Sequence, residues 1–153
     1  MNEKVKHHYT ECGLPDVWIE CRRVKDDTGA DIFIIPAINR LHKLIAEGIV
    51  MSDSALTGPE IRFLRSEMGL TQAELGELLH RTRLTIARWE SEDVKVGGAM
   101  DTLIRMFAIG NLKLKKAGPD EISRKYKIAR GEKKYRIPAY KTTSRVKQHR
   151  IAA

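Results

Sequence analysis

The sequence predicts an α+β protein: a small N-terminal module of one β-hairpin and one helix, then an all-α bundle of four to five helices, then a basic tail. Apolar and polar residues alternate from Val17 to Cys21, as in a half-buried strand. From Thr57 to Ile109 apolar residues recur at helical spacing, and residues suited to helix N-caps precede these stretches. After this point neither period continues. We therefore expect domains at residues 1–52, 53–111 and 112–153.

The N-terminal module is defined by turn residues. We expect residues 1–10 to be a flexible lead, followed by strands at residues 17–21 and 31–35. Asp26-Asp27-Thr28-Gly29 between the strands is typical of a turn, which predicts a hairpin. After Pro36, apolar residues at helical spacing predict a short helix from Ala37 to Glu47, stopped at Gly48.

The bundle is expected to begin with a helix that Thr57 caps. Pro59 suits the first turn, and Glu60 completes a capping box with Thr57. Gly69 supplies the C-terminal stop. The inner stripe of this helix is expected to be Ile61, Leu64 and Met68.

Leu70 to Glu90 is the most informative stretch, since it predicts two short helices across a tight turn. Thr71 and Glu74 form a second capping box, and Thr82 is the cap candidate of the second helix. The expected buried positions are Leu75, Leu78 and Leu79 in the first helix, and Ile86 and Trp89 in the second. Arg83, Thr85 and Arg88 then project to the other side, which gives the second helix an exposed face rich in guanidinium groups.

A closing helix is expected from Ala99 to Ile109, and Gly110 should end it. Its apolar side is predicted to consist of Met100, Leu103, Ile104 and Phe107, which we assign to core packing.

The segments Leu70–Leu75 and Thr85–Glu90 together resemble the helix-turn-helix of the Xre/Cro family of phage-repressor-type regulators, over about residues 57–109. The resemblance implies a sequence-specific, double-stranded-DNA-binding transcriptional regulator, a repressor acting as a homodimer, that reads the major groove with residues 83–91. It implies a semi-buried ion pair between Arg65 and Glu90. The expected DNA-contacting residues are Thr71, Gln72, Arg81, Thr82, Arg83, Leu84, Thr85 and Arg88, with Gln72 on phosphate and Arg83, Leu84 and Arg88 at base edges.

Two positions depart from the family pattern. His80 stands where the family usually has Gly, in a left-handed turn that costs a non-Gly residue about 1 kcal/mol. Arg81 replaces a residue that is often small or β-branched, which removes a packing contact and adds a cation.

Tyr9 to Gly13 resembles a degraded zinc knuckle, with Tyr9 in place of the first cysteine of a Cys-x-x-Cys-Gly. With the domain order, this is similar to MqsA-type antitoxins and implies an alternative function: neutralising a toxin protein through the N-terminal module while repressing its own operon. Four zinc ligands are not evident, because Cys12 and Cys21 would need help from His7, His8 or His42. We expect no metal and no cofactor, with both cysteines reduced.

Composition excludes other classes of function. No apolar run approaches the roughly 18 residues of a membrane span, and the polar N-terminus lacks a signal-peptide core, so a cytoplasmic protein without membrane partners is expected. No nucleophile elbow, P-loop or paired-carboxylate pattern appears, so no enzyme is expected.

The net charge of +8 arises entirely in the tail. Residues 1–110 carry 14 basic and 17 acidic side chains, and residues 111–153 carry 14 and 3. Disorder is expected in the tail, where tyrosines interleave with Lys and Arg. That composition suits nucleic acid, and equally a solubilising tail. The assignment of DNA binding thus depends on the pattern of residues 57–109.

Overall fold

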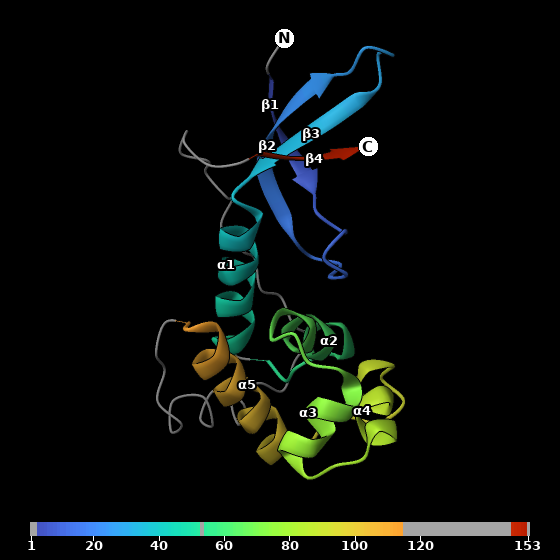
Figure 1. Ribbon diagram of the computed structural model, residues 1–153, viewed down its shortest axis with the longest axis vertical. Helices are drawn as coiled ribbons and strands as arrows, with labels where there is room; N and C mark the ends of the chain where they lie inside the picture. Colours follow the sequence, from blue (N-terminus) through green and yellow to red (C-terminus); the bar gives the residue numbers. More distant parts are fainter. Residues whose placement is uncertain (1–2, 53, 115–147, 153) are drawn as a thin grey trace. The chain divides into compact units, whose positions relative to one another are not determined.

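The computed structural model describes residues 3–52, 54–114 and 148–152 (Figure 1). These residues fall into two compact units that divide within helix α1 (Ile38–Val50), after Ile45. The first unit contains the strands and the first part of α1. The second contains the end of α1 and helices α2 to α5. The division lies inside α1.

The first unit is built on a four-stranded antiparallel sheet, in the order β1 (Glu3–His8), β2 (Trp18–Lys25), β3 (Asp31–Pro36) and β4 (Gln148–Ala152). The predicted turn joins β2 to β3, and Gly29 within it has a φ of +85°. The Asp26 carboxylate accepts hydrogen bonds from the backbone N–H groups of Thr28 and Ala30. Side-chain and backbone hydrogen bonds, led by that of the Thr28 hydroxyl, lower the pKa of Asp26.

The alternation in the sequence correctly identifies the buried face of β2. Val17, Ile19 and Cys21 are all buried, whereas Trp18 between them is 52% exposed. Ile35 on β3 and Ile45 on α1 are also fully buried in this unit. Tyr9, expected in a flexible lead, is buried too, and its hydroxyl lies 2.8 Å from Nε2 of His42 on α1.

Two strands of the sheet were not predicted. Residues 3–8 form β1 rather than a flexible lead, and residues 148–152 form β4 within the tail expected to be disordered. Both strands are short, polar and basic, so they present no continuous apolar stripe. They pair with β2 and β3 through backbone hydrogen bonds, which the side-chain pattern does not reveal. The rest of the tail, at residues 115–147, lies outside the described residues.

The expected stop of α1 at Gly48 is wrong, because the helix continues to Val50. Ile49 and Val50 are completely buried, and this burial offsets the roughly 1 kcal/mol that a glycine costs within a helix.

The second unit contains α2 (Gly58–Glu67), α3 (Gln72–Leu79), α4 (Arg83–Glu90) and α5 (Gly98–Leu112). Both predicted capping boxes are present: Thr57 with Glu60 at α2, and Thr71 with Glu74 at α3. Gly69, with a φ of +70°, follows the end of α2 as predicted. Completely buried side chains from each helix make the core, namely Leu64, Leu75, Ile86 and Ile104.

Two predicted burial patterns are wrong. Leu78 is 45% exposed, because Leu75 and Leu79 already form the buried seam of α3. On α5, Leu103 is 40% exposed, whereas Asp101 and Arg105 point inward with no exposed surface. The helix also passes through Gly110 and ends at Leu112.

The hydrogen bonds of the buried Arg105 guanidinium explain why α5 turns Asp101 and Arg105 inward in place of the predicted Leu103. Its Nε donates to the Asp101 carboxylate at 2.7 Å, and its two Nη atoms donate to the carbonyl oxygens of Val50, Ser52 and Ser54. The second Asp101 oxygen accepts the backbone N–H of Leu56. The pair therefore satisfies the backbone of the connection between α1 and α2, which hydrophobic periodicity cannot predict.

Among the described residues, no helix has both the length and the hydrophobicity needed to cross a membrane.

Candidate functional site

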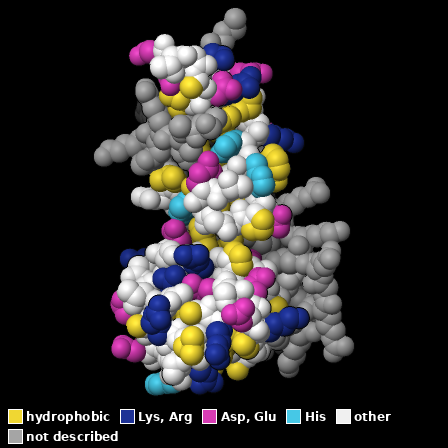
Figure 2. All heavy atoms as spheres, turned by 90° about the vertical axis from the view of Figure 1, so that its right-hand side faces the viewer, with side chains coloured by type: hydrophobic (Ala, Val, Ile, Leu, Met, Phe, Trp, Pro, Cys, Tyr) yellow, Lys and Arg dark blue, Asp and Glu magenta, His cyan; other side chains and the backbone are white. Residues whose placement is uncertain are grey.

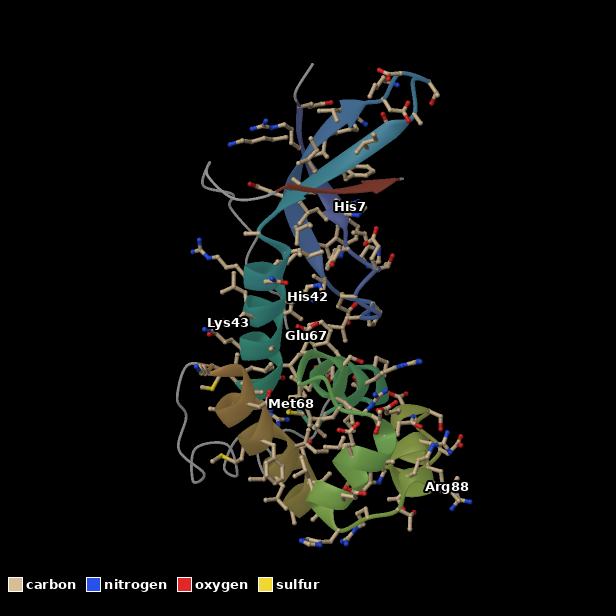
Figure 3. All side chains as sticks on the ribbon, viewed as in Figure 1. His7, His42, Lys43, Glu67, Met68 and Arg88 are labelled. Atoms are coloured by element: carbon tan, nitrogen blue, oxygen red, sulfur yellow. The ribbon has the colours of Figure 1, made fainter. Side chains whose placement is uncertain are left out.

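Helix α4 presents two chemically different sides. Ile86 is completely buried and Trp89 is 6% exposed, so this side anchors the helix in the core of its unit. Arg83 and Arg88 are exposed, and Leu84 is 55% exposed. Figure 3 shows Arg88 extending away from the neighbouring helices. The predicted outward positions of α4 are therefore accessible.

The turn that precedes α4 has the left-handed backbone expected at His80, with φ 54° and ψ 44°. The backbone N–H of Arg81 donates to the carbonyl of Gly76 at 2.8 Å, which closes the end of α3. This close approach requires a glycine inside α3, because a Cβ at Gly76 would lie 2.6 Å from the Arg81 carbonyl oxygen. Gly76 was not predicted as a key residue; the available signal was a glycine inside a helical pattern.

The first turn of α4 is fixed by two threonines. The Thr82 side chain accepts a hydrogen bond from the Thr85 backbone N–H at 3.2 Å. The two hydroxyl oxygens lie 3.0 Å apart. Thr82 is exposed and Thr85 is half-buried, so the pair lies at the surface beside Arg83. The cap sets where α4 begins and thereby which way its arginines point.

The expected ion pair between Arg65 and Glu90 is present. Nε of Arg65 lies 2.5 Å from one carboxylate oxygen, and Nη2 donates to the other at 3.2 Å. The side chains are only 13% and 6% exposed. Arg65 also donates to the carbonyl of Leu70, which ties α2 to the start of α3 and the end of α4.

Gln72 lies at the N-terminus of α3 as predicted, but its side chain has a partner within the protein. Its Nε2 donates to Glu90 at 3.0 Å. Glu90 therefore receives three hydrogen bonds from two helices. The phosphate contact that the family resemblance implies for this side chain would compete with the bond to Glu90.

The exposed surface around α4 carries both charges, because Glu92 and Asp93 directly after the helix are exposed as well as its arginines. α4 carries two exposed arginines, and its one carboxylate, Glu90, is turned inward. Arg81 in the preceding turn is exposed, and so is Thr71 at the start of α3. Lys and Arg side chains appear at several points on the visible face of this unit, among acidic and hydrophobic ones (Figure 2).

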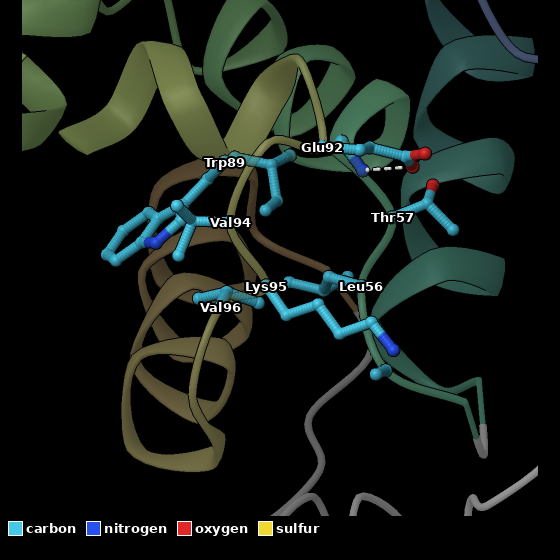
Figure 4. A pocket seen from close by; sticks show the side chains of 10 residues that line it. Leu56, Thr57, Trp89, Glu92, Val94, Lys95 and Val96 are labelled. Carbon is cyan, nitrogen blue, oxygen red and sulfur yellow. Dashed lines mark hydrogen bonds between the residues drawn. The ribbon is translucent and has the colours of Figure 1, made fainter. Parts of the chain in front are cut away.

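A groove lies beside the C-terminal end of α4 (Figure 4). It has a volume of about 330 Å³ and is bounded by Trp89, Leu56 and the segment 92–96. At one end the N–H of Gly58 donates to Glu92 at 3.0 Å. A Cβ at Gly58 would overlap the Glu90 carbonyl oxygen, so the start of α2 and the end of α4 meet backbone to backbone.

The candidate zinc ligands of the first unit have other partners. Nε2 of His7 is 3.3 Å from the Glu11 carboxylate, and the His8 ring contacts the Pro15 carbonyl. The Cys12 thiol donates to the Tyr9 carbonyl. Burial, reinforced by Glu11, raises the pKa of the Cys21 thiol to about 11. Within the described ranges, no cluster of three or more His, Cys, Asp or Glu side chains is arranged to hold a metal ion.

Comparison with protein-family models, with curated proteins and with solved structures gives no match to this chain.

Proposed function

We propose that this protein is a sequence-specific regulator of transcription that binds double-stranded DNA and reads the major groove with α4. One observation carries the proposal. α4 is anchored by Ile86 and Trp89, while Arg83, Leu84 and Arg88 are exposed on its other side. An α-helix fits the major groove, and a guanidinium can donate to both O6 and N7 of guanine.

The neighbouring contacts support this role because they hold α4 rigidly. The Thr82 cap fixes its first turn, and Glu90 links its last turn to α2 and α3. A preorganised reading helix loses little conformational entropy on binding. We assign Arg83 and Arg88 to guanine edges and Leu84 to a thymine methyl group. Thr85 contacts a base or phosphate.

Backbone contacts come from the residues that flank α4. Arg81 and Thr82 lie before its first turn, and Thr71 and Gln72 begin α3. Unpaired N–H groups at a helix N-terminus favour an anion. We therefore assign the N-terminus of α3 and the side chain of Arg81 to phosphates, which fix the register without reading sequence. Gln72 reaches phosphate if it exchanges its bond to Glu90.

We propose that the regulator binds as a homodimer. On α5, Leu103 is 40% exposed, and Met100 and Phe107, which follow the same helical stripe, are half-buried. A second copy covering this stripe would remove apolar surface from water. A two-fold dimer predicts a palindromic site with half-sites about 34 Å apart.

Sedimentation tests the dimer. The native chain should sediment as a dimer, and Leu103→Asp should convert it to a monomer. A native chain that sediments as a monomer would contradict this arrangement.

Selection from a pool of random duplexes tests the function. The native chain should enrich one sequence, and Arg83→Ala and Arg88→Ala should each reduce discrimination by about 1–3 kcal/mol per base pair read. Arg62→Ala, which removes an exposed arginine from α2, is the matched control and should keep the native preference. Failure to enrich any sequence, or unchanged discrimination by both α4 variants, would exclude a reading role for α4.

The alternative, an antitoxin that binds a toxin protein through the first unit, stays a prediction from sequence resemblance. No contact in the described residues favours it over the DNA-binding function alone. Co-purification of a toxin encoded beside this protein would support it.

A further inference from the structure

The first unit exposes about half of a tryptophan side chain. Trp18, at the start of β2, is 52% exposed, although its neighbours Val17 and Ile19 are at most 1% exposed. Tryptophan is enriched at binding interfaces, where its apolar body packs while its N–H finds a hydrogen-bond partner.

The indole of Trp18 is held in one orientation. It stacks against the His8 ring with centroids 4.4 Å apart and an angle of 8° between the planes. His8 is fixed by its contact with the Pro15 carbonyl and by its pairing opposite Trp18 in the β1–β2 ladder. His8 covers one face of the indole, so the exposed half of the side chain lies away from His8. Binding at this second face would require little additional ordering.

Cations surround this aromatic pair on the same side of the sheet. In the β1–β2 register, Lys4 lies opposite Arg22 and Lys6 lies opposite Glu20. Because side chains two positions apart on a strand point to the same face, these four residues share the face of His8 and Trp18. Lys4, Lys6 and Arg22 are exposed, whereas Glu20 is half-buried. None of these three cations forms an ion pair with another residue in the described part of the chain. By contrast, Arg23 on the other side contacts the carboxylate of Glu3.

We propose that this surface, which we name the Trp18 face, binds single-stranded nucleic acid. It comprises Lys4, Lys6, His8, Trp18 and Arg22. A base stacks on the indole face opposite His8, extending the His8–Trp18 pair to three layers, and the cations contact the phosphates. Base–aromatic stacking with a cationic groove is the general chemistry of single-strand binding. The duplex-reading residues proposed for α4 take no part in it.

A comparison of two probes tests the proposal in the full chain. One is a fluorescein-labelled twelve-nucleotide oligodeoxythymidine, and the other is an abasic strand of equal length and charge. Fluorescence anisotropy should show that the native chain binds the thymidine strand more tightly, because only that strand can stack. Trp18→Ala should lose about tenfold in affinity for the thymidine strand and little for the abasic strand. Trp18→Phe should retain part of the preference.

Leu44→Ala is the matched control, since Leu44 is an exposed apolar residue of the same unit at 37% exposure. It should bind both strands as the native chain does. Equal affinity of the native chain for the two strands would overturn the proposal, and so would an unchanged preference in Trp18→Ala. The result is separable from the function proposed for α4: Trp18→Ala should keep duplex discrimination, and Arg88→Ala should keep the preference for thymidine over the abasic strand.

Discussion

Adjacent residues of α4 have opposite environments, one buried and one exposed. Trp89 is 6% exposed and contacts the core, whereas Arg88 is exposed to solvent. This contrast was predictable, because helical spacing sets residues 86 and 89 on one side. The contacts that could not be predicted from the sequence are those of polar side chains. Gln72 donates a hydrogen bond to Glu90, and Asp101 and Arg105 pair with each other in the interior. Their partners are distant in sequence or are backbone groups that no pattern specifies.

Trp89→Ala and Arg88→Ala form a pair that tests which of the two side chains anchors α4 in the core. Trp89→Ala removes a buried indole and should lower the free energy of unfolding by about 3–5 kcal/mol. Arg88→Ala should change it by less than about 0.5 kcal/mol, as at other exposed positions. Urea denaturation followed by circular dichroism measures both. Similar losses in the two variants would mean that Arg88 is part of the core.

The buried thiol of Cys21 should make the free energy of unfolding depend on pH in the alkaline range. Its pKa is raised from 9.0 to about 11 in the folded state, chiefly by burial. Between these values the unfolded chain loses the thiol proton while the folded chain retains it, so the stabilisation present below pH 9 is lost as the pH rises toward 11.

Comparison with Cys21→Ala isolates this effect from the titration of Lys and Tyr. The native chain should be more stable than the variant at pH 8, and its advantage should shrink by pH 11. Chemical denaturation at a series of pH values provides the measurement. An advantage that stays constant across this range would show that Cys21 ionises equally in both states.

At the scale of elements, capping residues predicted where helices begin better than glycines predicted where they end. The caps at Thr57, Thr71 and Thr82 were all predicted and are all present. By contrast, the expected ends at Gly48 and Gly110 are wrong, because both glycines lie inside helices. A cap is a local hydrogen bond that a few residues determine, whereas a glycine ends a helix only if the following residues gain nothing by continuing it.

Two glycines inside helices should respond oppositely to alanine. Gly76→Ala places a Cβ 2.6 Å from the Arg81 carbonyl oxygen in the turn before α4. We expect it to destabilise the second unit by about 1–3 kcal/mol, as overpacking does. Gly110 lies in α5, and beyond its own helix an added Cβ would meet no described atom within 4 Å, so Gly110→Ala should stabilise by about 0.5–1 kcal/mol.

Thermal unfolding of the two variants decides this prediction. Equal shifts of Tm would show that the turn can move away from α3, and that the position of α4 is set elsewhere.

At the scale of the whole molecule, the sequence predicted an α+β chain but not the extent of its sheet. The helices were located from local signals: α2, α3 and α4 each have a side-chain cap, and apolar residues recur at helical spacing in all five helices. Strands β1 and β4 were missed because short basic strands at the edges of a sheet are defined by their pairing partners. Charge gave little guidance, since residues 1–110 have no net excess of cations. The proposed reading surface depends on where three side chains of α4 point.

That reading surface is tested most directly by removing single atoms from the DNA. The duplex selected by the native chain is remade with 7-deazaguanine at one guanine at a time, which deletes the N7 acceptor in the major groove. The affinity for each duplex is then measured for the native chain, for Arg83→Ala and for Arg88→Ala. We predict that at least one replacement weakens native binding by about 1–3 kcal/mol, and that the same replacement has no effect in the variant that lacks the arginine reading that guanine. This prediction is contradicted if every replacement is neutral for the native chain, or if each has the same effect on the native chain and both variants.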